Sequence, residues 1–152
     1  GALAAERGKV RRADFSPELS AQDRRLLRQV EEALMECGFT LPARADLYRR
    51  FLGRVRPDHM ERLLALLEDL GRVAVIGEGL VLHKEVLERA RRLVGAALAR
   101  EGPLETPRLK ELLGVSRRYA LPILERLDAV GFTERVGNAR VLRTPSSAAP
   151  SS

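Results

Sequence analysis

An internal repeat is the feature that most limits how this chain of 152 residues can fold. The segment LLALLEDLGRVAVIGEGLVL (63–82) parallels YALPILERLDAVGFTERVGNARVL (119–142). With a three-residue insertion in the second copy, the matched pairs are Leu67/Leu124, Glu68/Glu125, Leu70/Leu127, Gly77/Gly137, Val81/Val141 and Leu82/Leu142. Each copy therefore predicts an amphipathic helix, a short strand, a glycine-bearing turn and a second strand.

Two more helical patterns precede the repeated part of each copy. In the first copy, apolar residues recur at helical spacing from Leu26 to Cys37, and RADLYRRF follows. In the second copy, the stripe runs from Leu87 to Leu98, EGP ends that helix, and Thr106 is expected to cap PRLKELLG. Three helices and a hairpin form a winged helix. The predicted fold class is mostly α with small β-wings, in tandem winged-helix (helix-turn-helix) domains.

The repeat also predicts the domain organisation. Residues 21–82 form winged-helix domain 1 and residues 83–144 form winged-helix domain 2. We expect residues 1–20 to end a preceding unit or to act as a linker in an excised fragment, and residues 145–152 to be a disordered tail. The chain has one cysteine, no signal peptide and no apolar run of membrane-spanning length, so we expect a cytoplasmic protein without membrane contact.

The positive charge is concentrated in the second unit. The whole chain has a net charge of +6. Residues 21–82 hold ten basic and ten acidic residues, whereas residues 83–144 hold thirteen and eight, a net charge of +5. An anionic partner is therefore expected for the second unit.

The last helix of the second unit opens with two adjacent arginines. With Ser116 as N-cap, one face carries Ala120, Ile123, Leu124, Leu127 and Val130. The opposite face carries Arg117, Arg118, Leu121, Pro122 and Glu125. A proline inside a helix is best tolerated on a solvent-facing side, so this opposite face is expected to be free of core packing.

Two cations at a helix N-terminus oppose the helix dipole. Together with the free first-turn amides of Arg117, Arg118 and Tyr119, they would form an anion site. The alternative is a solvated pair of arginines, which is common on exposed helices. The position favours the anion site, because this helix is the recognition helix of the fold.

Other candidate contacts lie on the same unit. They are Leu121 on the outer face of the last helix, Lys110 on the preceding helix, and Arg135, Asn138 and Arg140 on the wing, with Arg140 expected to hold a phosphate. Tyr119 either stacks a base or packs at the edge of the core. The first unit lacks such a cluster, because its third helix opens RPDHMERLL and its wing carries Glu78.

Catalytic and metal-binding patterns are not found in the sequence. His59, His83 and Cys37 do not have metal-ligand spacing, and no nucleophile triad or glycine-rich cofactor loop stands out. Glu31, Glu32 and Glu36 are interpreted as a solvated helix face. We expect no enzyme activity, no metal and no cofactor in this chain.

The segment PRLKELLGVSRRYALPILERLDAVGFTERVGNARVL (107–142) resembles the last winged-helix domain of the bacterial selenocysteine-specific elongation factor, the SelB family. GVSRRYALPILERLD and RVGNARVL carry this resemblance, and the layout of residues 22–143 is similar too. It implies an arm that binds a hairpin (a SECIS-type stem-loop) in selenoprotein messenger RNA beside a UGA codon read as selenocysteine. Arg117, Arg118 and Arg140 would then be RNA contacts, and Gly137-Asn138-Ala139 the wing turn.

The resemblance implies further partners only for a full-length family member. This chain has no GxxxxGKS/T loop, so GTP, Mg, the ribosome and selenocysteinyl-tRNA belong to that longer protein. We expect a monomer. Two alternatives stay open: a winged-helix fragment that binds duplex DNA as a transcription regulator, and a protein-docking module. An A-form duplex has a groove too narrow for a helix, so an RNA-bound form should grip a loop.

Overall fold

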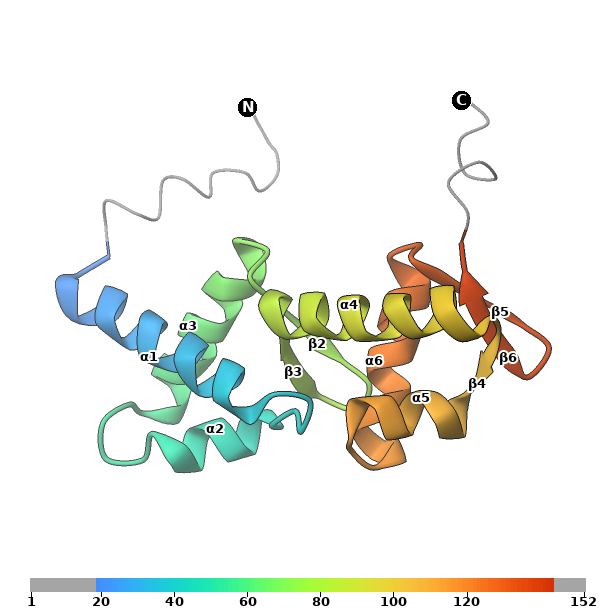
Figure 1. Ribbon diagram of the computed structural model, residues 1–152. Coiled ribbons are helices and arrows are strands. Elements are labelled where there is room, and N and C mark those ends of the chain that lie inside the picture. The colour runs from blue at the N-terminus through green and yellow to red at the C-terminus, as the bar shows by residue number, and fades with distance from the viewer. Residues whose placement is uncertain (1–18, 144–152) are drawn as a thin grey trace, which may run out of the picture.

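The computed structural model describes residues 19–143, so the predictions for residues 1–18 and 145–152 lie outside the described part. The first unit contains α1 (Ala21–Cys37), α2 (Arg44–Arg50), α3 (Pro57–Asp69), β2 (Val73–Ile76) and β3 (Leu80–His83). The second contains α4 (Lys84–Glu101), β4 (Leu104–Glu105), α5 (Thr106–Leu113), α6 (Arg117–Ala129), β5 (Thr133–Val136) and β6 (Ala139–Leu142). The fold is mostly α with two small sheets, as predicted (Figure 1).

Both predicted hairpins are present, and each wing also has a further pairing that the sequence did not reveal. In the second unit, β4 pairs with β6 and extends the sheet to the order β4-β6-β5. In the first unit, an isolated bridge between Ala43 and Leu80 takes the corresponding place. A two-residue strand and a single bridge are too short to give a period in the sequence.

The hairpin of β2 and β3, called here the inter-unit hairpin, lies between the helices of the first unit and α6 (Figure 1). All four residues of β3 are buried. Side chains alternate between the two faces of a strand. Val81 therefore packs in one core cluster, while Leu80 and Leu82 pack in the other. A strand buried on both faces reads as a continuous apolar run, here LVLH.

The two core clusters divide at this hairpin rather than at the end of the first unit. The first core cluster is built from α1, α2 and α3 with Val73 and Val81. The second core cluster combines α4, α5 and α6 with Leu41, Ile76, Leu80 and Leu82 of the first unit. The second unit therefore completes its core with side chains that precede α4.

A partly buried ionic cluster of Glu31, Arg72 and His83 ties α1 to the inter-unit hairpin, and it corrects the interpretation of Glu31 as a solvated residue. Glu31 is 9% exposed, and its Oε1 lies 2.8 Å from Nη2 of Arg72 and 3.2 Å from Nε2 of His83. The other ring nitrogen of His83, Nδ1, accepts the backbone N–H of Glu85 at 3.0 Å and so caps α4. Burial alone raises the pKa of Glu31, but the hydrogen bonds from Arg72 and His83 outweigh it and lower that pKa.

Candidate nucleic-acid interface

Helix α6 begins where the sequence predicted, at Arg117 after the N-cap residue Ser116. Ala120, Ile123, Leu124 and Leu127 are buried, as expected from the apolar stripe. Val130 is not: it is the C-cap residue, beyond the last helical residue Ala129, and it is 52% exposed. The core face therefore holds α6 so that Arg117 and Arg118 at its start face solvent, while Tyr119 and Ala120 meet the second core cluster.

The first turn of α6 has no anionic partner within the described residues. The Ser116 side chain makes no capping hydrogen bond, and the turn contains no acidic residue, unlike the first turns of α1, α2, α3 and α4. Arg117 and Arg118, called here the first-turn pair, are exposed and form no ion pair inside residues 19–143. One expected donor is occupied, since the N–H of Tyr119 reaches the carbonyl of Ser116 at 3.1 Å. The amides of Arg117 and Arg118 remain available.

The first-turn pair lines a cleft of about 440 Å³ between α6 and the turn of the inter-unit hairpin. The side chains that line the cleft include two cations, two carboxylates and several apolar residues. Its lining residues are Gly77, Glu78, Leu80, Arg117, Arg118, Leu121, Pro122 and Glu125. Leu121, a predicted site residue, is half-buried in it.

Packing around Pro122 differs from the prediction of a free outer face. A Cβ atom added to Gly77, whose φ is +57°, would lie 3.1 Å from Cγ of Pro122. The backbone of the hairpin turn therefore rests directly against the proline ring. Pro122 therefore faces the hairpin turn and is half-buried, where the sequence predicted a free outer face.

Arg140 is not a surface cation, and the prediction that it holds a phosphate is wrong for this structure. Its side chain is 2% exposed. Nη2 donates to Oδ2 of Asp128 at 2.9 Å, and Nη1 donates to the Thr106 hydroxyl at 3.4 Å. The guanidinium thus fastens the wing to α6 and to the start of α5. Since its charge is paired and enclosed, Arg140 leaves the group of candidate RNA contacts.

The other predicted site residues lie outside the cleft. Arg135 and Asn138 are exposed on the second wing, and Lys110 is half-buried on α5. The Tyr119 ring packs against the second core cluster, and the guanidinium carbon of Arg118 lies 5.2 Å from its centroid. Gly137 has a φ of +64°, as the predicted wing turn requires.

Sequence reasoning missed the contribution of the first unit to this site. Gly77, Glu78 and Leu80 form one wall of the cleft, although Glu78 was noted only as a sign that the first wing lacks cations. The unbroken apolar run of β3 was the available signal, because a solvent-exposed wing strand would alternate.

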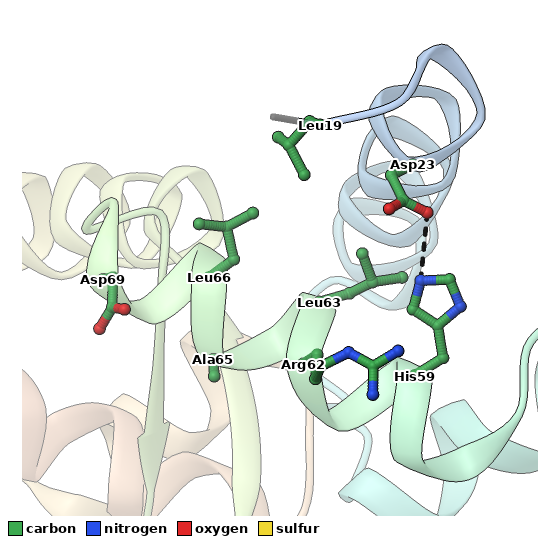
Figure 2. A pocket seen from close by; sticks show the side chains of 8 residues that line it. All are labelled: Leu19, Asp23, His59, Arg62, Leu63, Ala65, Leu66 and Asp69. Carbon is green, nitrogen blue, oxygen red and sulfur yellow. Dashed lines mark ion pairs between the residues drawn. The ribbon is translucent and has the colours of Figure 1, made fainter. Parts of the chain in front are cut away.

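The corresponding helix of the first unit has a different surface. A pocket beside α3 is lined by Leu19, Asp23, His59, Arg62, Leu63, Ala65, Leu66 and Asp69 (Figure 2). There Nε2 of His59 lies 3.1 Å from Oδ1 of Asp23, and both side chains are half-buried. With two carboxylates and one arginine, this pocket does not resemble an anion site.

Within the described residues, no group of three or more histidine, cysteine, aspartate or glutamate side chains is arranged to hold a metal. The helices there are also too short or too polar to cross a membrane.

The comparison of sequences and the comparison of structures both relate the second unit to elongation factor SelB. Residues 96–142 match the family "Elongation factor SelB, winged helix". The second unit is therefore similar to a SelB winged helix over this stretch. The stretch holds α5, α6 and the second wing, and with them every candidate contact named above in the second unit.

Solved structures extend the likeness over both units. The mRNA-binding domain of elongation factor SelB from E. coli, solved in complex with SECIS RNA, is 22% identical with a TM-score of 0.65, over 82% of this chain and 100% of that chain. A bacterial selenocysteine-specific elongation factor, EF-Sec, is 21% identical with a TM-score of 0.62, over 78% of this chain and 18% of that chain. At these identities the likeness establishes the tandem fold. A comparison with curated proteins found no match.

Proposed function

We propose that this chain binds an RNA stem-loop of the SECIS type and so directs selenocysteine incorporation at UGA. One observation carries the proposal: two unpaired arginines meet the uncapped N-terminus of α6 inside the segment that matches the SelB winged helix. The E. coli SelB domain of similar shape was solved with SECIS RNA.

The geometry suits a loop better than a regular stem. Arg117 and two free amides meet at one helix end, which matches a phosphate, and Arg118 is one residue further along the exposed face, where we propose that it reads a base edge. The A-form major groove is too narrow to admit α6 along its length. Arg135 and Asn138 on the exposed second wing are the second group of contacts that we propose, and Lys110 is a third.

The test is a binding measurement with the double variant Arg117→Ala/Arg118→Ala. Fluorescence anisotropy should be recorded against a pool of RNA hairpins with randomised loops. We expect affinity for the selected hairpins to fall more than tenfold, because charge-assisted contacts are each worth about 1.5–3 kcal/mol. Both side chains are exposed, so the free energy of unfolding should change by no more than about 0.5 kcal/mol.

A matched control removes two exposed arginines from a helix of the first unit. Arg25→Ala/Arg28→Ala makes the same change in charge on α1. Equal losses of affinity in the two double variants would mean that net charge, and not the first turn of α6, governs binding. Stronger binding of the parent to duplex DNA than to any hairpin would favour a transcription regulator instead.

The wider role follows from resemblance. We propose that this unit serves a longer elongation factor in the cytoplasm, where GTP and Mg bind another domain and the ribosome and selenocysteinyl-tRNA are the other partners. The matched family segment is a winged helix, and we propose that this chain is not itself an enzyme. We propose that the chain itself is monomeric, which sedimentation can test.

A further inference from the structure

We propose that the wing of the first unit, through Gly77 and Glu78, prevents α6 from reading duplex DNA and thereby restricts it to RNA loops. Glu78 is then a specificity-determining residue. The inference rests on the proposed function, because it concerns which nucleic acids can reach the first-turn pair.

The steric part starts from the width of the groove. The major groove of B-DNA is about 12 Å wide, and a helix with its side chains measures about 10–12 Å. A recognition helix therefore needs its outer face clear. Here the turn of the inter-unit hairpin lies against that face, since Gly77 touches Pro122 so closely that a Cβ would sit 3.1 Å from Cγ. A groove would have to hold the helix and the turn together.

The hairpin turn cannot easily move aside. Its flanking residues Ile76 and Leu80 are 8% and 4% exposed and belong to the second core cluster. Val81 between Leu80 and Leu82 packs on the opposite side, in the first core cluster. The turn is thus anchored in both units, and lifting it from α6 would expose apolar side chains to water.

The electrostatic barrier to duplex DNA arises from two carboxylates that line the cleft. Glu78 and Glu125 both line it, both are exposed, and neither has an ion-pair partner within residues 19–143. Glu125 follows Arg117 by about 12 Å along the helix axis, at about 1.5 Å per residue. A regular phosphate backbone laid along α6 from the first-turn pair would meet these negative charges. A loop that contacts only the first turn does not extend over Glu125, which lies about two turns further along α6.

The neutral variant Glu78→Gln/Glu125→Gln tests this directly. Affinities for one selected RNA hairpin and one B-form DNA duplex should be measured by anisotropy at the same salt concentration. Relief of one contact between like charges is worth about a fivefold change in affinity. We expect duplex affinity to rise at least about fivefold more than hairpin affinity. The melting temperature, read by circular dichroism, should stay unchanged, because both side chains are exposed.

Glu32→Gln/Glu68→Gln on α1 and α3 is the control for overall charge, because it makes the same change of +2 with two exposed residues that lie outside the cleft. Equal gains for hairpin and duplex in the test variant would overturn the proposal. A loss of hairpin affinity would overturn it too, because the carboxylates would then contact RNA donors. If the parent chain binds no hairpin at all, the proposed function fails, and that result is distinct from either outcome.

Discussion

Replacing Asp128 by alanine removes the partner of a guanidinium that the fold has buried. Two hydrogen bonds from Arg140 reach Oδ2 of Asp128, from Nη2 at 2.9 Å and from Nε at 3.1 Å. The Thr133 hydroxyl donates to Oδ1 at 2.6 Å. Without the carboxylate, the contact of Arg140 with Thr106 at 3.4 Å is the one side-chain hydrogen bond left to that guanidinium among the described residues.

The loss in free energy of unfolding should be large, and it should be larger when Asp128 is removed than when Arg140 is removed. Removing one partner of a buried ion pair costs about 3–5 kcal/mol, because the other charge stays buried without compensation. Arg140 is 2% exposed but Asp128 is 24% exposed, so water can solvate the acid better than the base. We expect Asp128→Ala to cost about 3 kcal/mol and Arg140→Met, which leaves the carboxylate, about 1–2 kcal/mol.

Urea unfolding followed by circular dichroism measures both variants. With a slope of about 2 kcal/mol per molar urea, Asp128→Ala should lower the midpoint by about 1.5 M, and Arg140→Met by less than about 1 M. The double variant should unfold at a higher urea concentration than Asp128→Ala alone, because it no longer buries a lone charge. An Arg140→Met shift as large as that of Asp128→Ala would refute the inference that the guanidinium is more deeply buried than its carboxylate partner.

Three further results are expected. If three phosphates are neutralised in a single-stranded loop, a plot of log affinity against log salt concentration should have a slope of about −2. Arg118→Ala should leave that slope unchanged and reduce discrimination among loop sequences, because we expect Arg118 to read a base edge. A shallower slope in this variant would assign Arg118 to a phosphate. Because the pKa of Glu31 is lowered in the folded state, its contribution to stability is present at neutral pH and is lost as pH falls below the ordinary value of 4.5. The difference in urea midpoint between the parent and Glu31→Gln should therefore shrink on acidification, and a widening gap would contradict the ion cluster. Gly95→Ala should lower the melting temperature, because the new Cβ would lie 2.8 Å from Cζ of Phe132. The cost of overpacking, about 1–3 kcal/mol, exceeds the helix-propensity gain of about 1 kcal/mol. An increase in melting temperature would show that the Phe132 ring moves freely.

The helices and turns were predictable because their signals are local. Apolar residues at helical spacing predicted α1, α4 and α6, and Gly137 marked the second wing turn. The start of α6 after Ser116 followed from its N-cap type and from the stripe that begins at Ala120. These features depend on residues within one or two turns of each other, which a single sequence displays directly.

The burial of Arg140 was missed because its partner lies in another element. A signal was nevertheless present. Residues two apart on a strand share a face, and Arg140 stands two before Leu142, which packs against the second core cluster. The strand period thus placed Arg140 on the inner side of the wing. The position of Asp128 opposite it depends on how α6 crosses β6, which one sequence does not reveal.

The role of the first wing was missed because winged helices were treated as separate units. Glu78 is informative only once the turn that carries it is known to lie beside α6. That placement is set by tertiary packing of Ile76, Leu80 and Leu82 in the second core cluster.

The inter-unit hairpin also makes the two repeats thermodynamically interdependent. In a repeat array, the free energy of unfolding is the sum of the stability of each repeat and the stability of the interfaces between neighbouring repeats. Here the single strand β3 contributes to both, because it is buried on both faces. Neither half can lose its order without uncovering apolar surface on the other, so melting should occur as a single calorimetric transition. The amide protons of β3 should then exchange with solvent only through global unfolding, and they should be among the slowest in the chain.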